Sequence, residues 1–401
     1  MEAFKRVFLI VIDSFGIGAM DDAATYGDEG ANTFLHIDER MDPFRIPNLM
    51  RLGLGELAQL AQPAHVCRNA PLTGYRCALK ERSVGKDTTT GHWEMMGLRT
   101  EKPFVTFTNT GFPQALIDEL ERRTGHEVIG NKAASGTEIL TELAGQELAS
   151  GSRKMIVYTS ADSVLQICGH EKSMGLDELY RVCQIARDIT MKPEWKVGRV
   201  IARPYLGDAE SGFERTPNRK DLSVDPPRKT VLDLLKDNGK DVVAIGKIHD
   251  IFNGRGITTS VHSDSSVEGM EQTIAMADEA WDGLVFTNLV DFDAKWGHRR
   301  NPIGYGRELE AFDGKLGELM DAMQETDLLI VTADHGNDPT HTGTDHTREK
   351  TPLLLWSPRF QSTGTLKTQS SFGTVGMTIL ANFDIGRKPY MIGDSVLEAL
   401  R

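Results

Sequence analysis

The sequence is short of cysteine and of positive charge, and each deficit excludes a class of protein. Its 401 residues include four cysteines, with no C-x-x-C pair and no zinc-finger spacing, so we expect neither a disulfide framework nor a cysteine-bound metal. The formal charge of -13 repels phosphate backbones, so nucleic acid is not an expected partner, and an anionic substrate must be met by local cations or metals. We interpret the cysteines, Cys67, Cys77, Cys168 and Cys183, as core thiols.

Long apolar runs are also missing. No run approaches the ~20 residues that a membrane-spanning helix needs. Lys5 and Arg6 precede an apolar segment in the manner of a signal peptide, but the segment is too short and Asp13 ends it. We therefore expect a cytoplasmic location and no membrane partner. The proportions of hydrophobic (39%) and charged (26%) residues are those of a globular protein, and the length suffices for two domains.

What the sequence does contain is a set of short apolar segments that end in aspartate. Segments 6–13, 283–290 and 328–331 have the composition of buried strands in a parallel sheet. Ligand sites of such sheets lie beyond the carboxyl ends of the strands, where these aspartates and the histidines that follow them would emerge. The candidate metal ligands are Asp13, Asp293, His298, Asp334, His335 and His346.

This ligand chemistry favours manganese, zinc or iron over calcium, which prefers shells made of oxygen alone. Six ligands suffice for two metals with open positions, and such a pair stabilises the attacking and leaving oxygens in phosphoryl transfer. His341, His92 and Asp338 lie in the same loops, so the residues alone leave them open as alternative ligands.

A polar loop at 85–94 is the second informative stretch. A phosphate-binding P-loop would need glycine at position 80 and a hydroxyl residue at 87, where this chain has Lys80 and Asp87. A dinucleotide fingerprint after the first strand is likewise excluded by Asp21. A metal-bound hydroxyl among residues 88–90 would be an activated nucleophile, and a threonine-rich turn with a helix cap is the alternative interpretation. The pattern does not choose among the three threonines.

The remaining patterns predict alternating helices and strands around an insertion. Strands are expected at 241–248 and 352–356, and helices at 229–238, 265–280, 305–323 and 372–383. Between 103 and 220 the texture changes to that of an inserted α+β domain, leaving a core of 1–102 and 221–401. Arginine side chains in the insertion could bind a phosphate, and a solvated charged loop is the alternative interpretation for each of them. The candidates are Arg199, Arg203, Arg215 and Arg219.

Five stretches carry the most specific patterns: Val11-Ile12-Asp13-Ser14, Gly85-Lys86-Asp87-Thr88-Thr89-Thr90-Gly91-His92-Trp93-Glu94, Asp291-Phe292-Asp293, Ala333-Asp334-His335-Gly336-Asn337-Asp338 and Gly343-Thr344-Asp345-His346-Thr347-Arg348-Glu349. Together they closely resemble the bacterial phosphopentomutase family of the alkaline phosphatase superfamily, and the resemblance covers essentially the whole chain. It implies an α/β fold, with an alkaline-phosphatase-like core that has a central mostly parallel sheet flanked by helices, plus an inserted α+β cap domain.

The resemblance also implies roles for individual residues. Thr88, directly after Asp87, would be the hydroxyl that becomes phosphorylated. One manganese would be held by Asp293, His298 and His346, and the other, beside Thr88, by Asp13, Asp334 and His335. Positions around the sugar phosphate would be Ser160, Asp162, Arg199 and Lys247.

The implied reaction interconverts ribose 1-phosphate, or its 2-deoxy analogue, with the 5-phosphate through a phosphothreonine enzyme and a 1,5-bisphosphate. The cofactors would be two Mn²⁺, with other divalent metals possible, and a sugar 1,6- or 1,5-bisphosphate as activator. The partners would be small-molecule pentose phosphates of nucleoside and pentose phosphate metabolism. Two rivals stay open: a phosphatase or phosphoglycerate mutase of the same superfamily, and a noncatalytic metal- or sugar-phosphate-binding protein.

Overall fold

The computed structural model describes residues 3–57, 65–66, 71–160 and 163–400. It divides into two compact units, one formed by Met1–Lys102 with Pro226–Arg401 and the other by Pro103–Asp225. Each is described by itself below. Two residues singled out in the sequence, Cys67 and Asp162, lie outside the described residues.

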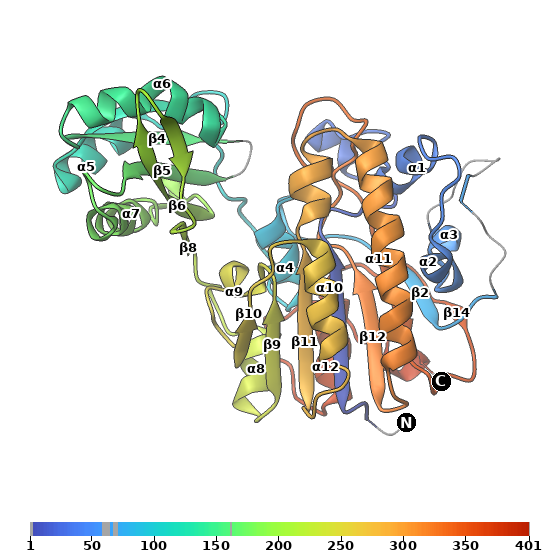
Figure 1. Cartoon of the computed structure of the whole chain (residues 1–401). Helices are drawn as coiled ribbons and strands as arrows, with labels where there is room; N and C mark the ends of the chain where they lie inside the picture. The colour runs from blue at the N-terminus through green and yellow to red at the C-terminus, as the bar shows by residue number, and fades with distance from the viewer. Residues whose placement is uncertain (1–2, 58–64, 67–70, 161–162, 401) are drawn as a thin grey trace. The chain divides into compact units, whose positions relative to one another are not determined.

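The first unit is built on an eight-stranded sheet with the order β10-β9-β11-β1-β12-β13-β2-β14 (Figure 1). Neighbouring strands from β10 to β12 run parallel, and β13 is antiparallel to both β12 and β2, which confirms the mostly parallel sheet expected from the sequence. The strands, in sheet order, are β10 (Thr259–Val261), β9 (Asp241–Ile245), β11 (Gly283–Leu289), β1 (Arg6–Ile12), β12 (Asp327–Thr332), β13 (Thr351–Trp356), β2 (Tyr75–Leu79) and β14 (Gly364–Thr365).

The three strands that end in candidate ligands are immediate neighbours. β1 lies between β11 and β12, and every residue of these three strands is buried. In the parallel register Ile12 is opposite Leu289, and Val11 is opposite Thr332. The three carboxyl ends therefore stop at the same edge of the sheet. The continuous apolar character of the strands follows from burial on both faces, which only a sheet covered by helices on both sides can provide.

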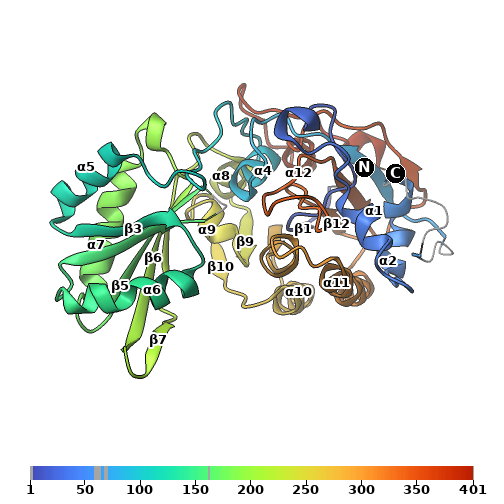
Figure 2. The same cartoon turned by 90° about the horizontal axis from the view of Figure 1, so that it is seen from above.

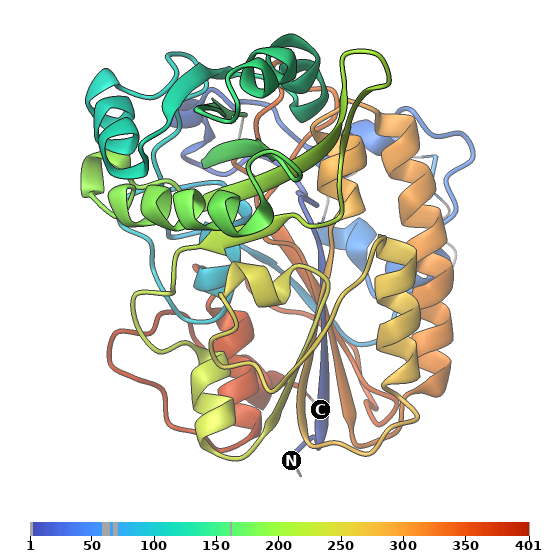
Figure 3. The same cartoon turned by 60° about the vertical axis from the view of Figure 1, so that its left-hand side comes forward.

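Helices cover both faces of this sheet (Figures 2 and 3). On one face α10 (Ser266–Ala275) packs beside α11 (Pro302–Ala322), and on the other lie α8 (Val231–Asp237), α12 (Thr374–Asn382), α4 (Thr88–Met95) and α9 (Ile248–Ile251). Three short helices precede β2: α1 (Thr33–Asp38), α2 (Pro47–Arg51) and α3 (Leu54–Leu57).

The second unit is an α+β domain with its own sheet in the order β3-β4-β5-β6-β7, with β8 pairing with β6. Helices α5 and α7 share an apolar cluster with one face of this sheet, and α6 packs on the other face. Its helices are α5 (Gln114–Thr124), α6 (Gly136–Ala149) and α7 (Leu176–Ile189). Its strands are β3 (Glu127–Ala133), β4 (Lys154–Thr159), β5 (Val164–His170), β6 (Arg199–Asp208), β7 (Gly212–Arg215) and β8 (Lys220–Ser223).

One predicted strand is shorter than the sequence suggested. The apolar pattern placed a strand at 241–248, but β9 stops at Ile245 because Gly246 adopts a φ of 74°, a left-handed conformation that favours glycine and turns the chain. Lys247 lies two residues beyond the end of β9, at the N-cap of α9. Within the residues that the structure describes, no helix combines the length and the apolar character that crossing a membrane requires.

Candidate metal centre and nucleophile

The candidate ligands converge at the common strand edge. Asp13 directly follows β1, and Asp334 and His335 follow β12 after one intervening residue. Asp293 lies in a short helical segment, η3 (Phe292–Gly297), just beyond β11. His346 returns to the edge from the loop after Asp334. All five of these side chains are buried.

The first ligand group consists of Asp13, Asp334 and His335, whose ligand atoms all lie within 4.8 Å of one another. The Nε2 atom of His335 is 3.2 Å from Asp334 Oδ2 and 3.6 Å from Asp13 Oδ1. Its Nδ1 lies 3.1 Å from the carbonyl oxygen of Gly336, which can only accept, so Nδ1–H donates and the Nε2 lone pair points into the group. Ser14, held at a left-handed φ of 75°, donates its backbone N–H to Asp334 Oδ1 at 3.0 Å. This unusual backbone conformation ties the ends of β1 and β12 together.

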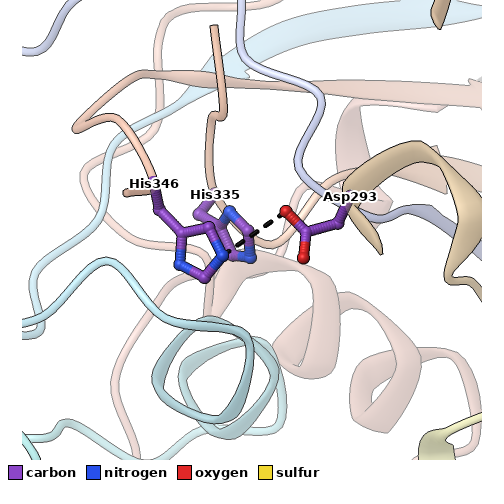
Figure 4. A group of neighbouring side chains, drawn as sticks. All are labelled: Asp293, His335 and His346. Carbon is purple, nitrogen blue, oxygen red and sulfur yellow. Dashed lines mark ion pairs between the residues drawn. The ribbon is translucent and has the colours of Figure 1, made fainter. Parts of the chain in front are cut away.

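The second group consists of Asp293, His335 and His346, again within 4.8 Å (Figure 4). His346 Nε2 is 3.4 Å from Asp293 Oδ1. His298 extends this group, because its Nε2 is 3.1 Å from both His346 Nε2 and Asp293 Oδ2. His335 therefore lies between two clusters. Since its Nε2 faces Asp13 and Asp334, we pair it with them and pair His298 with Asp293 and His346.

The electrostatics of these groups fit divalent cations. Burial raises the pKa of Asp13 well above its usual value, and the charge of Asp334 adds to the effect. Burial also opposes the ionisation of Asp334 and Asp293, but the positive charge of neighbouring histidines in their protonated form outweighs it and lowers the pKa of both carboxyls. Asp13 Oδ1 and Asp334 Oδ2 are buried oxygens that accept no hydrogen bond in the described part of the chain, although imidazole nitrogens of His335 and His92 each lie 3.2 Å from Asp334 Oδ2. Buried carboxylate oxygens that point toward one another and accept no hydrogen bond are suitable ligands for a bound cation, which would neutralise their charge.

The threonine loop forms the start of α4, and the geometry separates its hydroxyls. Thr88 is the first helical residue, and its Oγ1 lies 3.2 Å from His335 Nε2, at the first ligand group. Thr90 is occupied elsewhere: Asp87, the N-cap, accepts both its backbone N–H (3.0 Å) and its hydroxyl (2.5 Å). Of these two residues only Thr88 presents its hydroxyl to the ligand cluster. The helix N-terminus also favours negative charge on that hydroxyl.

Glycine and histidine one turn later hold α4 against the cluster. A Cβ at Gly91 would lie 2.1 Å from the carbonyl oxygen of Asp334, so only glycine permits this approach. His92 Nδ1 donates to the Thr88 carbonyl at 2.8 Å, which leaves Nε2 to accept from Asn288 at 3.3 Å. The same Asn288 amide lies 3.2 Å from Asp13 Oδ2. His92, an alternative ligand in the sequence, thus links helix α4 to the ligand cluster.

Two other alternative ligands also lie outside both groups. Asp338 Oδ2 accepts a hydrogen bond from His36 Nδ1 at 2.5 Å and another from the backbone N–H of Asn32. His341 is 3.6 Å from Asp28. The predicted substrate-binding residues are dispersed: Lys247 belongs to the first unit, whereas Ser160 follows β4 and Arg199 begins β6 in the second unit. Arg199 lies 3.6 Å from Asp221.

Sequence reasoning missed the residues that support the nucleophile loop. Buried Arg348 donates to the carbonyl of Gly85 at 2.6 Å and to the carboxylate of Glu81 at 2.5 Å, which fixes the loop leading to Thr88. Asn288 was also missed. Its signal was a polar residue inside a largely apolar strand, whereas Arg348 lay within one of the five specific stretches but was given no role of its own.

Comparisons with known proteins identify the family of the chain. Residues 5–386 match the family model described as the Metalloenzyme superfamily. The chain is 58% identical to a phosphopentomutase of Clostridium tetani and 57% identical to one of Clostridium beijerinckii, in both cases over 100% of each chain. Among solved structures, the PH0037 protein from Pyrococcus horikoshii is similar with a TM-score of 0.49 and 13% identity, covering 97% of this chain and 99% of that one. The chain belongs to the phosphopentomutase family, a family of metal-dependent isomerases within the Metalloenzyme superfamily.

Proposed function

We propose that this protein interconverts ribose 1-phosphate, or 2-deoxyribose 1-phosphate, and the corresponding 5-phosphate through a phosphothreonine at Thr88. The observation that carries the proposal is the position of the Thr88 hydroxyl, 3.2 Å from His335 Nε2 at the edge of a buried cluster of carboxylates and imidazoles. Membership of the phosphopentomutase family supports the substrate class.

The cluster would hold two divalent metals. We propose Mn²⁺, as the resemblance to the phosphopentomutase family implies, and mixed carboxylate and imidazole ligands are compatible with it, as they are with zinc or iron. Asp13, Asp334 and His335 would bind one ion, and Asp293, His298 and His346 the other. When bound, the metals would neutralise charge on the transferred phosphoryl group and lower the pKa of a coordinated hydroxyl. His335 also falls within 4.8 Å of Asp293 and His346, which supports two adjacent metal sites.

The residues of the chain would then carry phosphoryl transfer in two halves. In the first, the bond between phosphorus and Thr88 Oγ1 breaks while phosphorus bonds to the free sugar hydroxyl, which loses its proton, and a 1,5-bisphosphate forms. In the second, the phosphorus of the opposite phosphate bonds to Thr88 Oγ1, which loses its proton, while its bond to the sugar oxygen breaks and that oxygen takes up a proton. The N-terminus of α4, capped by Asp87, favours the extra negative charge at Thr88 in both halves. A sugar 1,6- or 1,5-bisphosphate would act as activator by phosphorylating an empty Thr88.

We further propose that unit Pro103–Asp225 is the cap of the enzyme and that residues 1–102 and 226–401 form its catalytic core. Ser160, Asp162 and Arg199 of the cap and Lys247 of the core would bind the sugar phosphate. Two half-reactions require that the bisphosphate be retained between them, and a closing cap serves this purpose by excluding water.

The test is covalent labelling. Incubation of the manganese-loaded protein with ribose 1,5-bisphosphate should add one phosphoryl group, which mass spectrometry of the 86–94 peptide should locate on Thr88. Thr88→Ala should carry no label and show no mutase activity. Thr89→Ala is the matched control and should retain both, because its hydroxyl has no role in the proposed chemistry. Label on Thr90, or full activity in Thr88→Ala, would refute the assignment.

The same preparation separates the rival functions. A phosphatase would release inorganic phosphate from pentose phosphates, and a phosphoglycerate mutase would convert 3-phosphoglycerate instead. A noncatalytic binding protein would show no turnover with added manganese. We expect isomerisation of the pentose phosphates without net hydrolysis.

A further inference from the structure

One arginine side chain joins the loops that carry the second ligand group. Arg300 lies two residues after His298, and all three nitrogens of its guanidinium donate hydrogen bonds. The acceptors are the carbonyl oxygens of Gly297 (3.1 Å), Asp338 (3.0 Å), Gly343 (2.6 Å) and Asp345 (2.8 Å) and the side-chain oxygen of Asn337. A single planar group therefore fixes three chain segments, around 297, 337–338 and 343–345.

Each of these segments leads directly to a proposed ligand. Asn337, which accepts from Arg300, donates its Nδ2 to Asp293 Oδ1 at 2.8 Å. The carbonyl of Thr344, between two residues bonded to Arg300, accepts from His298 Nδ1 at 2.6 Å, so the Nε2 of that ring is left with its lone pair toward the metal position. His346 follows at the end of the same loop. The contacts of Arg300 thus reach Asp293, His298 and His346.

The site requires the shape of arginine as well as its charge. Carbonyl and amide oxygens accept from Arg300 in several directions at once, which a planar fork with five N–H groups can satisfy and a lysine ammonium cannot. The backbone of Arg300 also adopts a left-handed φ of 52°, which is uncommon for a residue with a side chain. Strained backbone of this kind persists where surrounding contacts hold it, often at functional sites.

We propose that Arg300 and Asn337 are positioning residues that hold Asp293, His298 and His346 in place for one metal ion. The inference rests on the ligand assignment of the proposed function. Neither residue contacts the first ligand group through the hydrogen bonds described above, so the effect should be confined to one of two ions. Loss of such outer partners typically lowers metal affinity ~10- to 100-fold.

The experiment is a calorimetric titration of the full chain, stripped of metal with a chelator, with Mn²⁺. Wild type should bind two ions. Arg300→Lys and Asn337→Ala should each bind one ion normally and the other ~10- to 100-fold more weakly. The matched control is Arg299→Lys, an exposed neighbouring arginine, which should bind both ions as wild type does. Unfolding midpoints of the metal-free variants should stay close to wild type, which separates positioning from general loss of structure.

His298→Ala provides the reference, because it removes a proposed ligand and should lose one ion. If His298→Ala loses an ion but Arg300→Lys and Asn337→Ala keep wild-type affinity for both, the positioning inference is wrong and the ligand assignment stands. Equal weakening of both ions would also overturn it. If His298→Ala itself still binds two ions tightly, the ligand assignment fails and takes the positioning inference with it.

Discussion

Replacing Gly91 with alanine should impair catalysis by moving the nucleophile, although residue 91 has no side chain to do chemistry. The added Cβ would lie 2.1 Å from the carbonyl oxygen of Asp334, whereas ordinary contact begins at 3.4 Å. That oxygen belongs to the backbone at the end of β12 and cannot rotate away, so helix α4 would have to retreat by about 1 Å. Thr88 lies one turn earlier on the same helix and would move away from His335 Nε2 with it.

The expected magnitude follows from the size of that displacement. A misplacement of about 1 Å at a reacting group can cost ~100-fold in rate. The overpacking should cost ~1–3 kcal/mol of stability, offset in part by the ~1 kcal/mol by which alanine exceeds glycine in helix propensity. We therefore expect kcat to fall about 100-fold while the protein stays folded and both metals remain bound, since α4 supplies none of the proposed ligands.

The assay is steady-state interconversion of pentose phosphates, together with phosphorylation at Thr88, melting temperature and manganese content. Gly314→Ala is the matched control, because Gly314 lies within helix α11 of the same unit and a Cβ there meets nothing within 4 Å. It should keep wild-type kcat and melt at the same or a higher temperature. A Gly91→Ala variant with kcat and phosphorylation within threefold of wild type would refute the reasoning.

Two further predictions concern the carboxylates. Asp334→Ala should abolish mutase activity, and elemental analysis should find one bound metal fewer. The variant should remain folded, because the substitution removes the charge repulsion between Asp334 and Asp13. Two bound metals with normal turnover would contradict the ligand assignment. Burial raises the pKa of Asp313 from 3.8 to about 6. The folded protein therefore binds the extra proton between about pH 4 and pH 6, and stability falls by up to ~3 kcal/mol as pH rises through that window. Urea unfolding at saturating manganese should show this fall in wild type and not in Asp313→Asn, and equal pH dependence in the two proteins would refute it.

The connection between these predictions is the covered parallel sheet. Because β11, β1 and β12 are adjacent and in register, side chains from residues more than 300 positions apart, such as Asp13 and Asp334, meet at one edge. Because that edge is buried, the carboxylates repel one another strongly, and bound cations would relieve this repulsion. Burial also means that small changes in packing lower the stability of the protein. Because the loops at this edge are held by such contacts, substitutions of supporting residues such as Arg348 and Arg300 should be tested beside those of the proposed ligands.

The sequence by itself determined the fold class and the identity of the family. Continuous apolar segments predicted buried parallel strands, because only strands covered on both faces lack polar alternation, and the structure confirms the mostly parallel sheet. Aspartates at the ends of those segments predicted one shared edge, and the structure brings Asp13, Asp293 and Asp334 together there. Local patterns sufficed for this prediction, because the apolar residues of a strand and the polar residue that ends it are adjacent in the sequence.

Only the tertiary structure decided which contacts each side chain makes. Thr88 and Thr90 are chemically equivalent in the sequence, and the cap formed by Asp87 and the packing of α4 distinguish them. His335 was assigned to one group, but the structure places it between two. Arg300 joins loops through its hydrogen bonds. The conformations of these loops depend on local turns, among them the left-handed backbone conformation of Arg300 itself. Periodicity reports which face of an element is buried, whereas these pairings arise from loop geometry and from contacts between segments far apart in the chain.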